Sequence, residues 1–168
     1  MRGLRVGDSA VYAGHGIGRV VVELGQKQVG GTKRDSVVVD LDASLRVTLS
    51  LEEASVRLRA VADKNEVEDV RRTLVAESSP LDTQCKSRVK ESKAKLASGR
   101  HAELAEIIRD GSRFERLRGS ESSDAERRVY HQARELLIRE ISSACGREQV
   151  EAEIWIEAQN ALSGRNED

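Results

Sequence analysis

The sequence predicts an α+β protein in which a small SH3-like β module precedes a compact, all-helical domain. Two patterns support this class. Residues 1–60 hold short β-branched runs separated by turn residues, as in a small sheet. From Asp63 onward, apolar residues recur at every third or fourth position, which is the helical period. Only four of the 168 residues are aromatic, so aliphatic side chains must build both cores.

The N-terminal region contains about five short strands, too few for a sandwich of ordinary size. They fit a small, strongly bent sheet or SH3-like barrel, a type of module that usually binds a partner. Turns are expected at Ala13-Gly14-His15-Gly16, at Gly30-Gly31 and at Asp42-Ala43-Ser44. The expected strands are residues 9–12, 17–24, 36–41 and 45–51, with a last short one at 56–58.

The remainder is expected to be helical. Asp63 with Glu66, and Ser123 with Glu126, match the capping-box pattern of helix starts. Pro80 favours a boundary, so we expect a β module at 1–60, a connecting helix and linker at 61–80, and a helical domain at 81–168. The expected helices of that domain are residues 82–99, 101–110 (broken by Gly111), 123–145 (ended by Gly146) and 147–162. The third should carry Val129, Ala133, Leu136, Leu137 and Ile141 on one face, and the last should bury Val150, Ile154, Ala158 and Trp155.

The stretch Asp82–Gly99 is strongly basic and amphipathic. Asp82 can cap its start, and Gly99 can end it. Cys85, Val89, Ser92 and Leu96 form one narrow, mostly apolar stripe at helical spacing. Basic residues flank this stripe: Lys86, Lys90 and Lys93 on one side, Arg88 and Lys95 on the other. Such a helix can rest on an apolar surface while its flanks meet an anion.

The formal net charge of −1 conceals a segregation of charge along the chain. Residues 83–118 carry ten basic and five acidic side chains, whereas residues 119–168 carry six and eleven. One interpretation is an ordinary alternation of charged helices. The other is an anion-binding patch on a protein too acidic overall to coat nucleic acid indiscriminately.

Nothing in the sequence indicates an enzyme. The three histidines are scattered, no Cys/His cluster has zinc spacing, and no cofactor is expected. The glycines around His15 precede a strand and not a helix, so the dinucleotide-binding pattern fails. No membrane helix, signal peptide or small-molecule substrate site is predicted. We therefore expect a cytoplasmic protein with reduced cysteines.

Three stretches together resemble the CarD-like (CdnL) bacterial transcription regulators. Their opening motif is similar to GDSAVYAGHGIGRV in this chain. Their DNA-facing helix and the helix after it resemble SRVKESKAKLASGR and HAELAEIIRD. Their long C-terminal helix resembles AERRVYHQARELLIREIS. The resemblance runs from about Val6 to Leu162. It implies a Tudor-like module that binds the RNA polymerase β subunit and a helical domain that contacts promoter DNA upstream of the melted bubble, which modulates open-complex stability.

The resemblance also implies site residues. Arg88, Lys90 and Lys95 match basic positions of the family, and Lys86 and Lys93 extend the DNA-contacting set. Ser87 stands where the family commonly has arginine. The wedge tryptophan of the family corresponds to Cys85, whose small side chain cannot prop open a base step. The polymerase-contacting positions fall near Lys27, Arg46 and Thr48.

The departure at Cys85 leaves alternatives open. The chain can be an adaptor on RNA polymerase whose helical domain has lost the DNA wedge and binds another regulator. Lys86 and Arg88 near Cys85 also allow a redox-sensitive thiol. Against this stands the simpler interpretation that Cys85 fills an apolar position in the helical bundle.

Overall fold

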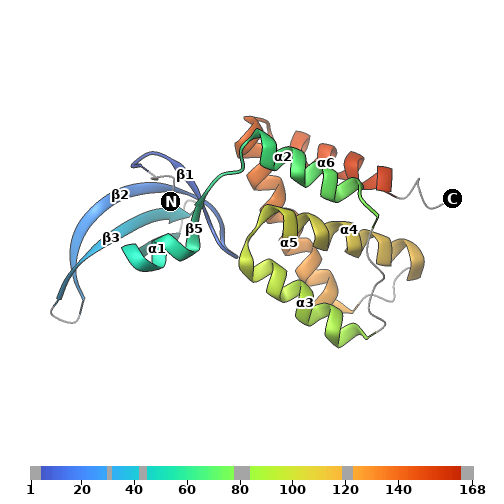
Figure 1. Cartoon of the computed structure of the whole chain (residues 1–168), viewed down its shortest axis with the longest axis horizontal. Helices are drawn as coiled ribbons and strands as arrows, with labels where there is room; N and C mark the ends of the chain where they lie inside the picture. The colour runs from blue at the N-terminus through green and yellow to red at the C-terminus, as the bar shows by residue number, and fades with distance from the viewer. Residues whose placement is uncertain (1–4, 30–31, 42–44, 78–83, 119–122, 164–168) are drawn as a thin grey trace. The chain divides into compact units, whose positions relative to one another are not determined.

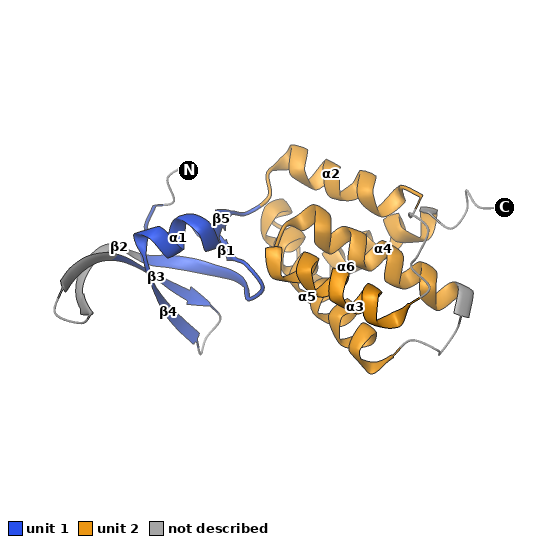
Figure 2. Ribbon diagram, turned by 60° about the horizontal axis from the view of Figure 1, so that its bottom comes forward, with its two compact units in different colours: residues 1–61 blue, residues 62–168 orange. Residues whose placement is uncertain are grey.

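The computed structural model describes residues 5–29, 32–41, 45–77, 84–118 and 123–163. Two compact units follow one another along the chain, residues 1–61 and residues 62–168 (Figure 2). The first is built around an antiparallel sheet and the second from helices (Figure 1). The predicted α+β class is confirmed.

The first unit contains a five-stranded sheet in the order β4-β3-β2-β1-β5. Each pair of neighbouring strands is antiparallel. Between β1 and β2 lies a turn at residues 13–15, in which His15 stacks on Tyr12 with ring centroids 4.7 Å apart. The strands are β1 (Ser9–Tyr12), β2 (Gly16–Val29), β3 (Thr32–Leu41), β4 (Leu45–Ser50) and β5 (Leu58–Ala60).

The strands β2 and β3 are longer than the sequence predicted. The predicted end of the strand before Gly25 is wrong, because β2 continues through this glycine. The pairing of β2 with β3 shifts its register between Val20 and Gly25, and these shifts let the strand continue. The predicted turns at 30–31 and 42–44 lie outside the described residues. Alternating side chains of the strands close the core, including Ala10, Val20, Val39 and Leu41.

A short helix, α1 (Leu51–Arg57), separates β4 from β5. The prediction that the strand begins at Val56 is wrong, because Val56 lies in this helix and β5 begins at Leu58. The Ser50 hydroxyl accepts a hydrogen bond from the Glu53 backbone N–H, and the Glu53 carboxylate accepts one from the Ser50 N–H. This capping box supplies hydrogen-bond partners for the first turn. The helix itself packs on the sheet core through the buried Ala54.

The second unit is a bundle of helices around an aliphatic core. Its helices are α2 (Lys64–Val75), α3 (Cys85–Ser98), α4 (His101–Arg118), α5 (Asp124–Cys145) and α6 (Gln149–Ser163). Both predicted capping boxes of this unit are present, Asp63 with Glu66 and Ser123 with Glu126. The predicted helix ends at Gly99 and Gly146 are confirmed, because both residues adopt the left-handed conformation. Asp82 and Pro80 lie outside the described residues.

Helix α5 passes through the centre of the bundle and presents the predicted apolar face. Val129, Ala133, Leu137 and Ile141 are buried there. They meet Val70 and Leu74 of α2, Leu104 and Ile108 of α4, and Ile156 of α6. The buried Glu140 of α5 accepts a hydrogen bond from the Ala62 N–H at 3.2 Å, which ties the start of the second unit to its core.

Two predictions about the helical unit are wrong. Gly111 does not break a helix: α4 runs through it to Arg118, and an added Cβ there would lie 2.5 Å from the Tyr130 ring. Glycine is thus present because α4 and α5 approach closely at this point. Val150 and Ile154 are not buried either, since they are 65% and 60% exposed, and Ala158 is exposed with them. The opposite face of α6, with Ala152 and Ile156, packs into the core, and Trp155 is partly buried against it.

Candidate nucleic-acid interface

Helix α3 lies on α4 and α5 through the stripe that its sequence predicts. Leu96 is buried in the core of the unit, and Cys85, Val89 and Ser92 on the same face are half-buried. The helix begins at Cys85 after Gln84, whose side chain makes no capping hydrogen bond. The inward face therefore fixes which of the flanking basic residues remain available at the surface.

Arg88 points inward. Its Nε lies 2.9 Å and its Nη2 2.8 Å from the Oε1 atom of Glu126 at the start of α5. The guanidinium carbon also lies 4.3 Å from the ring centroid of Phe114 on α4. The side chains of Arg88 and Glu126 are only 13% and 16% exposed. Because its donors are already engaged, Arg88 joins α3 to both neighbouring helices and is poorly placed to reach DNA.

Lys95 is also engaged by carboxylates. Its Nζ lies 2.8 Å from Glu91, one turn earlier on α3, and 3.0 Å from Glu106 on α4. Burial lowers the pKa of Lys95, but the hydrogen bonds that its ammonium group donates to these two carboxylates more than compensate, so that its pKa is raised. Lys95 stays charged and joins α3 to α4.

Lys86, Lys90 and Lys93 form the outward lysine row of α3. All three are exposed. Their spacing of four and three residues places them on one side of the helix, over an axial length of about 10 Å. No carboxylate forms an ion pair with any of the three among the residues that the structure describes. The predicted set of five cations is thus divided into three that face solvent and two that hold the helix in place.

Cys85 lies at the junction of α3 and α5. Its Sγ is 3.4 Å from both the Ser123 Oγ and the Glu126 Oε2. These are the two residues of the α5 capping box, so the thiol lies against the start of that helix. This position agrees with the simpler interpretation of Cys85 as a residue of the bundle.

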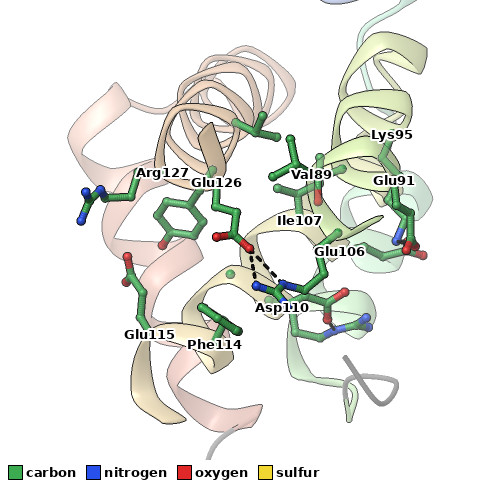
Figure 3. A pocket seen from close by; sticks show the side chains of 16 residues that line it. Val89, Glu91, Lys95, Glu106, Ile107, Asp110, Phe114, Glu115, Glu126 and Arg127 are labelled. Carbon is green, nitrogen blue, oxygen red and sulfur yellow. Dashed lines mark hydrogen bonds and ion pairs between the residues drawn. The ribbon is translucent and has the colours of Figure 1, made fainter. Parts of the chain in front are cut away.

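A cavity of about 280 Å³ lies where α3, α4 and α5 meet (Figure 3). Glu126 reaches into it and Phe114 forms part of its wall, while Lys95, Glu91 and Glu106 gather at another side. Several charged groups of its wall form ion pairs with one another: Arg88 pairs with Glu126, and Arg109 pairs with Asp110 at 2.8 Å. The cavity therefore belongs to the surface on which α3 packs, where ion pairs join α3 to α4 and α5.

Glu126 is the residue of this region that the sequence did not single out as a site. Burial raises its pKa, but hydrogen bonds from the Ser123 backbone and side chain, from Arg88 and from Cys85 outweigh burial and lower the pKa overall. Glu126 therefore stays ionised. The capping-box pattern did place it at a helix start, but no spacing in the sequence connects it with α3.

In the β unit, Arg46 and Thr48 lie on β4, an edge strand, and both are exposed. Arg46 lies opposite Asp40 of β3 in the register, and its Nη2 donates to the Asp40 Oδ2 at 2.9 Å. This hydrogen bond lowers the pKa of Asp40. Lys27 lies in β2, and its side chain is outside the described residues. Arg46 is thus held in one orientation at the edge of the sheet.

None of the helices described combines the length and apolar character needed to cross a membrane. Across the described ranges, no three His, Cys, Asp or Glu side chains cluster closely enough to hold a metal ion.

The helical unit matches a known protein family. Residues 69–157, which extend from α2 into α6 and contain all of α3, match the model of the CarD C-terminal domain. This match covers more than half of the chain, and it includes both the lysine row and the residues that form ion pairs with Arg88 and Lys95. The chain therefore belongs to the CarD-like family of transcription-related proteins.

Proposed function

We propose that this protein is a cytoplasmic transcription regulator that binds the RNA polymerase β subunit and contacts promoter DNA, thereby modulating open-complex stability. The observation that carries the proposal is the lysine row of α3. Lys86, Lys90 and Lys93 are exposed on one side of a helix whose other cations are engaged inside the unit. Three adjacent ammonium groups, none of them ion-paired within the described part of the chain, fit successive phosphates of a nucleic-acid backbone.

The proposed DNA contact is weak and independent of sequence. Each lysine that neutralises a phosphate releases a counterion, and three such contacts give a salt-sensitive site of modest affinity. Tethering to a bound polymerase raises the local concentration of DNA and makes such a site effective. The β unit supplies the tether in this proposal.

The edge strand β4 supports the proposed tether. An edge strand presents unpaired backbone N–H and C=O groups, to which a strand of another protein can add. Arg46 and Thr48 project from this strand, and Lys27 belongs to the same predicted contact set. We propose that these residues meet the polymerase.

The family wedge has no counterpart at residue 85 in this proposal. The Cys85 thiol lies against Ser123 and Glu126, and it is too small to enter a base step. We therefore propose that the protein acts on the open complex by holding the DNA backbone.

The test is the lifetime of open promoter complexes formed by RNA polymerase with the full-length chain. The variant Lys86→Glu/Lys90→Glu/Lys93→Glu should abolish the effect of the protein on this lifetime, while its binding to polymerase persists. Lys64→Glu is the control for each single reversal, such as Lys90→Glu, since Lys64 is an exposed lysine on α2 and one lysine is reversed in both. A wild-type protein that binds polymerase yet leaves the lifetime unchanged would contradict the proposal.

A further inference from the structure

Helix α6 carries a second apolar face that no described part of the helical unit covers. Val150 and Ile154 are 65% and 60% exposed, and Leu162 is also exposed. With the exposed Ala158 and Ala161 they form one row along the helix, which we call the α6 stripe. The row is about 18 Å long, since twelve residues separate its ends. The opposite face of α6 already packs on α2 and α5, so the stripe is additional to the core.

Glutamates border the α6 stripe on both sides. Glu151 and Glu157 lie three residues before and after Ile154, which places them about 60° to opposite sides of it. Glu151 has no ion-pair partner among the described residues. On the other side, Arg134 is shared between Glu153 and Glu157, so that one cation faces two carboxylates. Both borders therefore remain acidic.

The neighbouring helix α2 adds no net positive charge, since it carries three basic and three acidic residues. On α2, which packs beside α6, Arg71 pairs with Glu68 and Arg72 with Asp69. The stripe is thus an apolar row inside an acidic frame, on a different helix from the lysine row. In Figures 1 and 2, α2 and α3 lie at opposite sides of the helical unit.

The glutamates beside the α6 stripe indicate which kind of partner can bind it. A second copy of α6 would bring carboxylates beside carboxylates in either orientation, and such like-charge contacts are unfavourable. A helix with an apolar row and basic borders would instead cover the α6 stripe and form ion pairs with the glutamates on both sides of it. We propose that the α6 stripe docks an amphipathic helix with lysine- or arginine-lined borders from a partner protein. This partner would bind independently of DNA.

The experiment uses two designed helical peptides with the same leucine row, one bordered by lysine and the other by glutamate. Binding of each labelled peptide to the full-length chain is followed by fluorescence anisotropy. The lysine-bordered peptide should bind and the glutamate-bordered peptide should not. Ile154→Ser should weaken binding of the lysine-bordered peptide at least tenfold. Val56→Ser is the matched control, because Val56 is an aliphatic residue of α1 that is 82% exposed, and it should change nothing.

A charge reversal provides the second variant. Glu151→Lys should weaken the lysine-bordered peptide and improve the glutamate-bordered one, whereas Glu52→Lys, at an exposed position of α1, should do neither. Thermal unfolding checks that each variant is folded. Absence of binding to wild type, equal effects of Ile154→Ser and Val56→Ser, or indifference to the charge at residue 151 would overturn the proposal. So would a dimer seen in sedimentation that Ile154→Ser dissolves, because the occupant would then be a second copy.

Discussion

The two sides of helix α3 carry the same kind of charge but differ in what surrounds it. On one side Arg88 and Lys95 meet acids of α4 and α5, and on the other Lys86, Lys90 and Lys93 meet solvent. A basic helix in the sequence is therefore an incomplete guide to an anion-binding surface. The acids of the neighbouring helices determine which cations remain available.

Substitutions on the two sides of α3 should therefore differ in their effect on the free energy of unfolding. Removing an inward cation leaves a half-buried carboxylate without its partner, which destabilises the fold. An outward lysine contacts mainly solvent, so its removal should leave the stability of the fold unchanged and weaken only the proposed binding of DNA.

The largest effect is expected for Arg88→Ala. The substitution removes both the Glu126 ion pair and the contact with Phe114, and it should lower the free energy of unfolding by about 2–3 kcal/mol. Urea unfolding followed by circular dichroism measures this change. Lys90→Ala is the control and should stay within about 0.5 kcal/mol of wild type. If Arg88→Ala left stability unchanged while weakening DNA binding, Arg88 would belong to the outward set.

A smaller loss is expected for Cys85→Trp. The thiol lies 3.4 Å from Ser123 and Glu126, so an inward indole would overpack the α3–α5 junction and cost about 1–2 kcal/mol. Cys85→Ser is the control of similar size, and its thermal unfolding should stay close to that of wild type. An unchanged melting temperature together with longer-lived open complexes would mean instead that residue 85 faces the DNA.

Lys90→Gln and Lys95→Gln form a matched pair, because each removes one charge from the same helix. Lys90→Gln should weaken binding to duplex DNA several-fold at low salt, with no change in stability. Lys95→Gln should cost about 0.5–1 kcal/mol of stability by releasing Glu91 and Glu106, with little change in DNA binding. Equal losses of DNA affinity would remove the distinction between the two sides.

The smallest effect is a pH dependence at Glu126. Its pKa is lowered in the folded unit, so its contribution to stability is complete above the ordinary pKa of a glutamate, roughly 4, and is lost as the pH falls through the lowered value. Glu126→Gln should therefore make the helical unit less stable at neutral pH and less sensitive to acid. Unfolding of both proteins between pH 7 and acid measures this difference, and parallel pH profiles would contradict it.

Much of the fold follows from local signals in the sequence. Two capping boxes, two left-handed glycines and the apolar face of α5 are all set by nearby residues, and each was predicted correctly. Helix α1 was missed although Ser50 and Glu53 form the same capping pattern, because the preceding residues alternate as a strand does.

The errors arise where distant residues decide. Gly111 continues a helix because Tyr130 of α5 packs against it. Helix α6 has apolar residues on two faces, and periodicity alone cannot tell which one meets α2 and α5. The candidate site has the same difficulty, since Glu126 lies 38 residues from Arg88 in the chain.

The most direct test of the comparison is the salt dependence of DNA binding. Full-length wild type and Lys86→Gln/Lys90→Gln/Lys93→Gln are titrated with duplex DNA over a series of salt concentrations. If the lysine row contacts three phosphates, the slope of log K against log salt should become shallower by about 2–3. An unchanged slope in a folded triple variant would contradict the assignment of the outward lysines to DNA.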